Sequence, residues 1–112
     1  MEMHQVRYFL SVCQTLNFTR AAEECHVSQP ALSRAIRQLE AELGGELLRR
    51  ERSLTQITDL GRRVLPALRQ CYEGRLAARS LAQSYLKEGH APLRLALSRS
   101  IEMELLSPLH GV

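Results

Sequence analysis

Several features that mark broad protein classes are missing from this sequence. Its 112 residues contain no run of about 18 consecutive apolar residues, so we expect no transmembrane helix and no membrane partner. Glu2, His4 and Arg7 interrupt the N-terminus, which therefore lacks the pattern of a signal peptide. There is no glycine-rich phosphate loop, and the four histidines are scattered without a Ser/His/Asp or Cys/His arrangement. We therefore expect that the chain is not an enzyme.

Cysteine is also scarce. Cys13, Cys25 and Cys71 are odd in number and form no C-x-x-C pair. Two of them fall on apolar helix stripes, where a reduced thiol packs as a small hydrophobic group. Cys25 and His26 could suggest a metal site, but adjacent residues rarely share a metal ion and no second pair of ligands is evident. We expect no metal, no cofactor and a reducing, cytoplasmic location.

Lysine is nearly absent, since 14 of the 15 basic residues are arginine, and the formal net charge is only +3. Residues 20–52 contain six Arg and six Glu, so this segment is neutral as a whole. Residues 49–79, by contrast, hold eight Arg against three acidic residues. Such a local excess suits the neutralisation of phosphates, so the placement of the charges says more about the partner than their sum.

Residues 18–43 predict two helices joined by a tight turn. Thr19 is the expected N-cap of the first, because its hydroxyl can accept from orphan backbone N–H groups. Ser28 is the expected N-cap of the second, and Pro30 falls in the first turn, where its missing N–H costs nothing. Two N-caps nine residues apart leave room for one short helix and a turn. This arrangement is a helix-turn-helix.

The second of these helices divides into two faces. Its apolar residues recur at helical spacing and are Leu32, Ala35, Ile36, Leu39 and Leu43. Its other face carries Gln29, Ser33, Arg34 and Arg37, with no acidic residue between Ser28 and Gln38. Arg and Gln can contact guanine and adenine edges in the major groove, whereas Ser28 and Ser33 suit phosphate oxygens. An ordinary amphipathic helix with a solvated polar face is the alternative, but the paired caps and the segregated arginines favour binding to double-stranded DNA.

The flanking residues support the same architecture. A first helix would cover the motif with a stripe formed by Val6, Phe9, Leu10, Cys13 and Leu16. Gly44 would end the long helix. Residues 47–58 are strand-like at both ends with a charged middle, which predicts a small hairpin, or wing. Its arginines, Arg49, Arg50 and Arg52, would reach a phosphate or the minor groove, or would instead pair with Glu46 and Glu51 in a solvated loop.

With these residues in view, the chain resembles LysR-type transcriptional regulators. The matching residues are 16–22 (LNFTRAA), 27–33 (VSQPALS), Ile36, 39–40, 43–44, 47–48, Arg50, 57–58 and Gly61. The resemblance covers residues 3 to about 100 and departs from the usual family pattern at Leu48, Ser53 and Leu54. It implies that the residues at the DNA are Gln29, Pro30, Ser33, Arg34 and Arg37, with Thr19, Arg20 and Ser28 near the phosphates.

The fold implied is mainly α: a winged helix-turn-helix of three helices and a small β-hairpin over residues 1–58, then a long linker helix over 59–88. Thr58 is its expected N-cap, and Pro66 should kink it, since proline in a helix interior costs roughly 3 kcal/mol if unrelieved. The resemblance implies that two such helices pair and give a homodimer that reads a near-palindromic operator. We expect the pairing residues Leu65, Leu68, Tyr72 and Leu76 to be exposed in a single chain.

Residues 89–112 combine a hinge at Gly89–Pro92 with the alternating pattern of a strand over 93–97. The resemblance implies the start of an effector-binding domain, so we expect a shortened form of a longer regulator, with any small-molecule effector bound only by the longer parent protein. One alternative function is a dimerisation module that blocks full-length regulators. A winged-helix protein of another regulator family is the structural alternative, which the wing length and the SQPALSR run disfavour.

Overall fold

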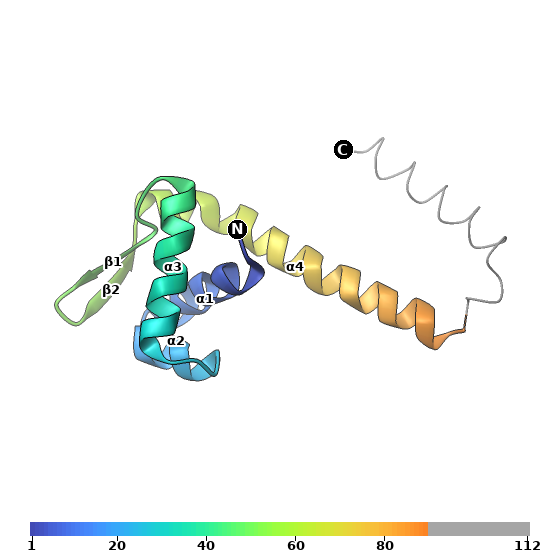
Figure 1. Cartoon of the computed structure of the whole chain (residues 1–112). Coiled ribbons are helices and arrows are strands. Elements are labelled where there is room, and N and C mark those ends of the chain that lie inside the picture. Colours follow the sequence, from blue (N-terminus) through green and yellow to red (C-terminus); the bar gives the residue numbers. More distant parts are fainter. Residues whose placement is uncertain (90–112) are drawn as a thin grey trace. The chain divides into compact units, whose positions relative to one another are not determined.

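The computed structural model describes residues 1–89, and within them the chain forms four helices and one antiparallel hairpin (Figure 1). In chain order the elements are α1 (Met3–Thr15), α2 (Phe18–Glu24), α3 (Gln29–Leu43), β1 (Leu48–Glu51), β2 (Leu54–Ile57) and α4 (Asp59–Lys87). A first compact unit comprises Met1–Arg75, and a second begins at Leu76. The prediction of a mainly α winged helix-turn-helix followed by a long helix is confirmed. The predicted strand over 93–97 lies outside the described residues, as does the hinge beyond Gly89.

The N-cap predicted for α2 is wrong by two residues. Asn17, not Thr19, precedes the helix in an extended conformation, with φ −152° and ψ 111°. Its Oδ1 accepts a hydrogen bond from the backbone N–H of Arg20 at 2.9 Å. Thr19 lies inside the first turn, where its own backbone is already helical. An N-cap needs non-helical backbone and a side-chain oxygen beneath the orphan donors, and Asn17 meets both requirements.

The ends of α3 agree with the prediction. Ser28 Oγ accepts from the N–H of Ala31 at 3.2 Å, and Pro30 lies in the first turn. At the other end Gly44 adopts a left-handed φ of 87°, and its N–H donates to the carbonyl of Glu40 at 2.8 Å. A left-handed residue closes a helix at little cost only when it has no Cβ. Local residue chemistry therefore fixes both ends of this helix.

The core lies where α1, α2 and α3 pack on one another. Its largest fully buried side chains are Phe9, Leu32, Leu39, Leu47, Val6 and Val12. Leu16 does not belong to it, contrary to the predicted stripe: α1 ends at Thr15, and Leu16 is the left-handed C-cap with 49% of its surface exposed. The helical spacing cannot continue past the last helical residue, and the buried side chain in the last turn of α1 is that of Val12.

The predicted wing is present as β1 and β2, with Leu48 opposite Ile57 and Glu51 opposite Leu54. The carboxylate of Glu40 ties α3 to the start of β1, since its Oε2 accepts from the N–H groups of Leu47 at 2.8 Å and Leu48 at 3.3 Å. The hairpin is therefore anchored to the helix that precedes it by charge-assisted hydrogen bonds.

The long helix α4 begins as predicted, because Thr58 Oγ1 accepts from the N–H of Gly61 at 3.0 Å. Gly61 has no room for a side chain, since a Cβ would lie 2.3 Å from the carbonyl oxygen of Leu47. The helix continues through Pro66, and the bend expected there stays a prediction. None of the helices within residues 1–89 is both long and apolar enough to cross a membrane.

Leu68 corrects one expectation for α4. It was predicted to be exposed, yet only 4% of its surface is accessible in the single chain, because it packs into the core of the first unit. Leu65 and Tyr72 are half-buried against the same core. Of the four predicted pairing residues, only Leu76 is exposed, with 43% of its surface accessible. The first part of α4 thus packs on the helix-turn-helix. The boundary predicted at residue 58, between a DNA-binding domain and a linker helix, remains a prediction.

Candidate nucleic-acid interface

One side of α3 faces away from the core. Leu32, Ala35 and Leu39 are buried, whereas Arg34 and Arg37 on the opposite side are exposed. The remaining polar residues of this side, Gln29 and Ser33, are half-buried, and Pro30 is exposed. The period of the α-helix places these side chains on the side opposite the buried stripe. The sequence spacing therefore placed the polar face of α3 correctly.

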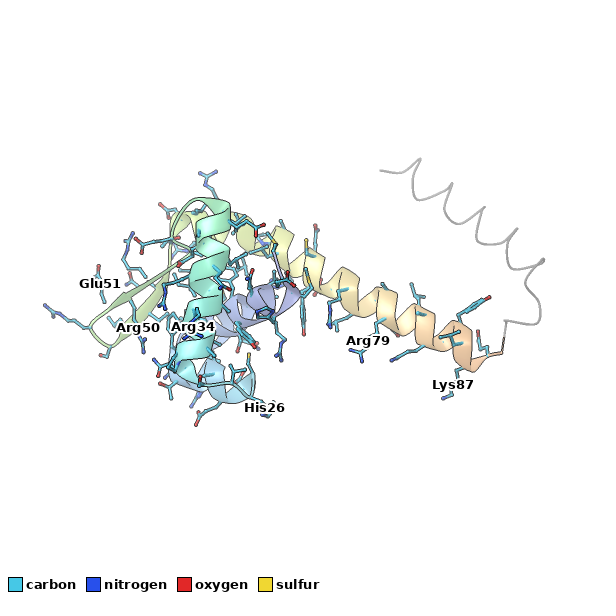
Figure 2. The ribbon with its side chains drawn as sticks, viewed as in Figure 1. His26, Arg34, Arg50, Glu51, Arg79 and Lys87 are labelled. Carbon is cyan, nitrogen blue, oxygen red and sulfur yellow. The ribbon has the colours of Figure 1, made fainter. Side chains whose placement is uncertain are left out.

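The amide of Gln29 connects this face to the hairpin. Its oxygen faces Arg50 and its nitrogen faces Thr19, because donors then meet acceptors on both sides. In this orientation Oε1 accepts from Arg50 Nη2 at 2.7 Å and from Nη1 at 3.0 Å, while Nε2 donates to Thr19 Oγ1 at 3.2 Å. Figure 2 shows Arg34 on α3 and Arg50 on the neighbouring hairpin. Three elements, α2, α3 and β1, thus contribute to one polar network.

The guanidinium of Arg50 also contacts an aromatic ring. Its guanidinium carbon lies 4.7 Å from the centroid of the Phe18 ring, within the range of a cation–π contact. Phe18 is itself buried at the start of α2. Sequence analysis did not predict this contact, because Phe18 and Arg50 lie 32 positions apart and no helical or strand period relates them. The sequence showed only that an aromatic residue, Phe18, lies next to the N-cap of α2.

The other two wing arginines have no such aromatic contact among the described residues. Arg49 and Arg52 are exposed, and Arg52 lies at the hairpin tip with a left-handed φ of 54°. Within residues 1–89, neither Arg49 nor Arg52 forms an ion pair with Glu46 or Glu51, so the alternative of a self-paired wing is not seen in this part of the chain. Contact of these arginines with a phosphate or the minor groove stays a prediction.

The residues predicted to lie near phosphates surround the start of α3. Thr19, Arg20 and Ser28 are all exposed. The hydroxyl of Ser28 accepts from the Ala31 N–H, and its own proton remains available for an acceptor such as a phosphate oxygen. Thr19 is joined to Arg50 through Gln29, which contacts both of them, whereas the pairing residues of α4 lie on another element.

Within residues 1–89, the cysteines and histidines form no comparable cluster. No group of three or more His, Cys, Asp or Glu able to hold a metal ion occurs within the described part of the chain. Cys25 is buried and the adjacent His26 is exposed with a left-handed φ of 60°. Burial raises the pKa of the Cys13 thiol to about 11, which Arg69 partly opposes. At neutral pH Cys13 is therefore a protonated thiol in an apolar setting.

Comparison with known proteins agrees with this geometry. The chain is 44% identical over 87 residues to the Hca operon transcriptional activator HcaR of Escherichia coli (strain K12), an alignment that covers 74% of this chain and 29% of HcaR. The chain thus spans less than a third of the length of that relative. Its relatives are transcriptional regulators, in agreement with the prediction that the chain is not an enzyme.

Two solved complexes share the fold. The CbnR DBD–DNA complex has a TM-score of 0.66 and 38% identity, and the match covers 75% of this chain and 99% of that one. The complex of BenM DBD with catB site 1 DNA has a TM-score of 0.72 and 31% identity, and covers 77% of this chain and 96% of that one. The family model for bacterial regulatory helix-turn-helix proteins of the lysR family matches residues 3–62, more than half of the chain. This protein therefore belongs to the LysR family and carries its helix-turn-helix DNA-binding domain.

Proposed function

We propose that this chain reads a specific double-stranded DNA sequence through the exposed face of α3, and that it does so as a homodimer in the cytoplasm. The observation that carries the proposal is the polar side of α3, where Arg34 and Arg37 stand free of the core beside Gln29 and Ser33. An α-helix fits the major groove of B-DNA, and arginine can donate two hydrogen bonds to one guanine. Arg34, Arg37 and Gln29 are the residues of this face that we assign to base edges, with Pro30 in apolar contact beside them.

The start of α3 and the hairpin tip would hold the DNA backbone. Thr19, Arg20 and Ser28 present hydroxyl and guanidinium donors around the N-terminus of α3, where the helix dipole favours an anion. Arg52 at the exposed tip of the wing would reach a phosphate or the minor groove. Such contacts fix the orientation of the helix and make binding depend on salt, without selecting bases.

Pairing through α4 would let a second copy of the chain read the second half-site of the DNA. Three leucines of this helix are exposed in the single chain: Leu76, Leu81 and Leu86. Exposed apolar side chains favour burial against a partner. Tyr72 and Leu65 would add their exposed parts, whereas Leu68 is already buried in its own chain. Light scattering at micromolar concentration should give the mass of a dimer, and a monomer would refute this part of the proposal.

Selection from a random duplex library tests DNA reading directly. We expect a dyad-symmetric site with two equivalent half-sites, since a two-fold symmetric dimer matches a near-palindromic operator. The affinity for the selected duplex should also fall steeply as salt rises. Salt-sensitive binding with no preferred sequence would contradict the proposal, and would favour the alternative of a dimerisation module that interferes with full-length regulators.

A further inference from the structure

The contact between Arg50 and Gln29 has a consequence for how bases are read. We propose that Arg50 is a positioning residue that occupies the amide oxygen of Gln29, so that Gln29 meets the DNA as a hydrogen-bond donor only. This inference rests on the proposed function, because it concerns which base the α3 face selects. It differs from the expectation that Arg50 contacts a phosphate, and it narrows the contact with base edges that the sequence predicts for Gln29.

The hydrogen-bonding capacity of the Gln29 amide is largely used within the protein. An amide oxygen has two lone pairs, and both terminal nitrogens of Arg50 donate to this oxygen, at 2.7 and 3.0 Å. The amide nitrogen has two N–H groups, one of which donates to Thr19 Oγ1 at 3.2 Å. The acceptor side of Gln29 is therefore filled within the protein, while one N–H is left for a base edge.

Arg50 is held in place by contacts on more than one side. Its guanidinium stacks over the buried ring of Phe18, with 4.7 Å between the guanidinium carbon and the ring centroid. It extends from β1, whose first residues are tied to α3 by the carboxylate of Glu40. A planar guanidinium held on an aromatic face and donating through both terminal nitrogens keeps one geometry better than a flexible cation would. Arg50 therefore arrives at the DNA already engaged with Gln29.

The four bases present different hydrogen-bond donors and acceptors in the major groove. Guanine presents two acceptors there and thymine one, adenine presents an acceptor beside a donor, and cytosine presents a donor. When the oxygen and the nitrogen of its amide are both available, Gln prefers adenine, because it can then pair with the acceptor and the donor of that base together. A Gln with its oxygen occupied loses that advantage. The base opposite Gln29 should therefore be guanine or thymine in preference to cytosine, with no special preference for adenine.

The test compares base preference in the full 112-residue chain and four variants. Library selection with the unchanged protein gives the site, and Gln29→Ala identifies the base position at which preference is lost. Affinity is then measured for the four duplexes that differ only at that position. Arg50→Ala removes the contact, and Arg50→Lys keeps the charge but cannot donate to the amide oxygen from two nitrogens at once. Arg49→Ala, on the same strand, is the matched control for loss of one positive charge.

Both Arg50 variants should raise the affinity for the adenine duplex relative to the guanine and thymine duplexes by about fivefold, the worth of roughly one hydrogen bond. Arg50→Lys should retain the salt dependence of the unchanged protein, and it carries the test should Arg50→Ala fail to fold. Arg49→Ala should leave the ratios among the four duplexes unchanged. If the Arg50 variants weaken all four duplexes by one common factor, Arg50 is a backbone contact and the inference is overturned. Absence of any selected sequence with the unchanged protein would overturn the proposed function itself.

Discussion

Replacing Leu68 by alanine should destabilise the folded chain rather than simply loosen a dimer. Leu68 lies on α4 but is 4% exposed and packs into the core of the first unit. The substitution removes three buried carbon groups, each worth about 0.8 kcal/mol, and leaves part of their volume empty. The expected loss in the free energy of unfolding is about 2.5–3 kcal/mol. For a domain of this size that corresponds to a fall in Tm of roughly 10–20 °C.

Leu76→Ala is the matched control, because Leu76 has the same side chain on the same helix but is 43% exposed. It should change the unfolding of the single chain by no more than about 0.5 kcal/mol, while it weakens self-association. Urea unfolding monitored by circular dichroism, repeated at several protein concentrations, separates the two effects, since only dimer stability depends on concentration. If Leu68→Ala leaves the unfolding of the monomer unchanged and only raises the dimer dissociation constant, the reasoning from burial fails and Leu68 is a pairing residue.

Four further substitutions test separate parts of the structure. Arg34→Ala should cost about 1–3 kcal/mol in specific binding and relax preference at one base position in library selection, and an unchanged preferred sequence would contradict its assignment to a base edge. Asn17→Ala should cost about 1 kcal/mol in urea unfolding and Thr19→Ala much less, because only Asn17 caps α2; the reverse order would contradict the observed cap. The pKa of Cys13 is raised from 9.0 to about 11 in the fold, so the unfolded chain loses its proton first as pH rises. Stability should therefore fall between about pH 9 and 11, and Cys13→Ala should lessen that fall relative to the unchanged chain; equal pH dependence in both proteins would show that Cys13 is not its source.

The parts of the fold that depend on local chemistry were predictable from the sequence. Ser28, Pro30 and Gly44 fix the ends of α3 by the backbone geometry that each permits, and neighbouring residues suffice to recognise them. Asn17 and Thr19 show the limit of this reasoning. Both can cap a helix and they lie two positions apart, so only the conformation of the backbone decides between them. Spacing alone also extended the stripe of α1 to Leu16, one residue beyond the end of that helix.

Burial on α4 could not be derived from its own sequence. Its apolar residues recur at helical spacing whether they face a partner chain or the core of the same chain. Which of these two surfaces Leu68 meets depends on how α4 packs against the elements before it. The apolar residues of residues 59–88 follow no clean heptad repeat. This irregularity is expected of a helix that packs against two different surfaces.

The network of Phe18, Gln29 and Arg50 lies beyond sequence reasoning for a related cause, and it changes how the interface should be interpreted. The face of α3 was placed correctly from the spacing of its polar residues, but spacing says which side chains point outward, not which of their atoms are already bonded. Arg50 is 21 positions away from Gln29 and on another element, yet it fills the acceptor that would have decided between adenine and the other bases. A substitution in β1 can therefore change base preference without removing any contact to DNA. It follows that the hairpin and α3 have to be considered together when the base preference of this domain is derived from its residues.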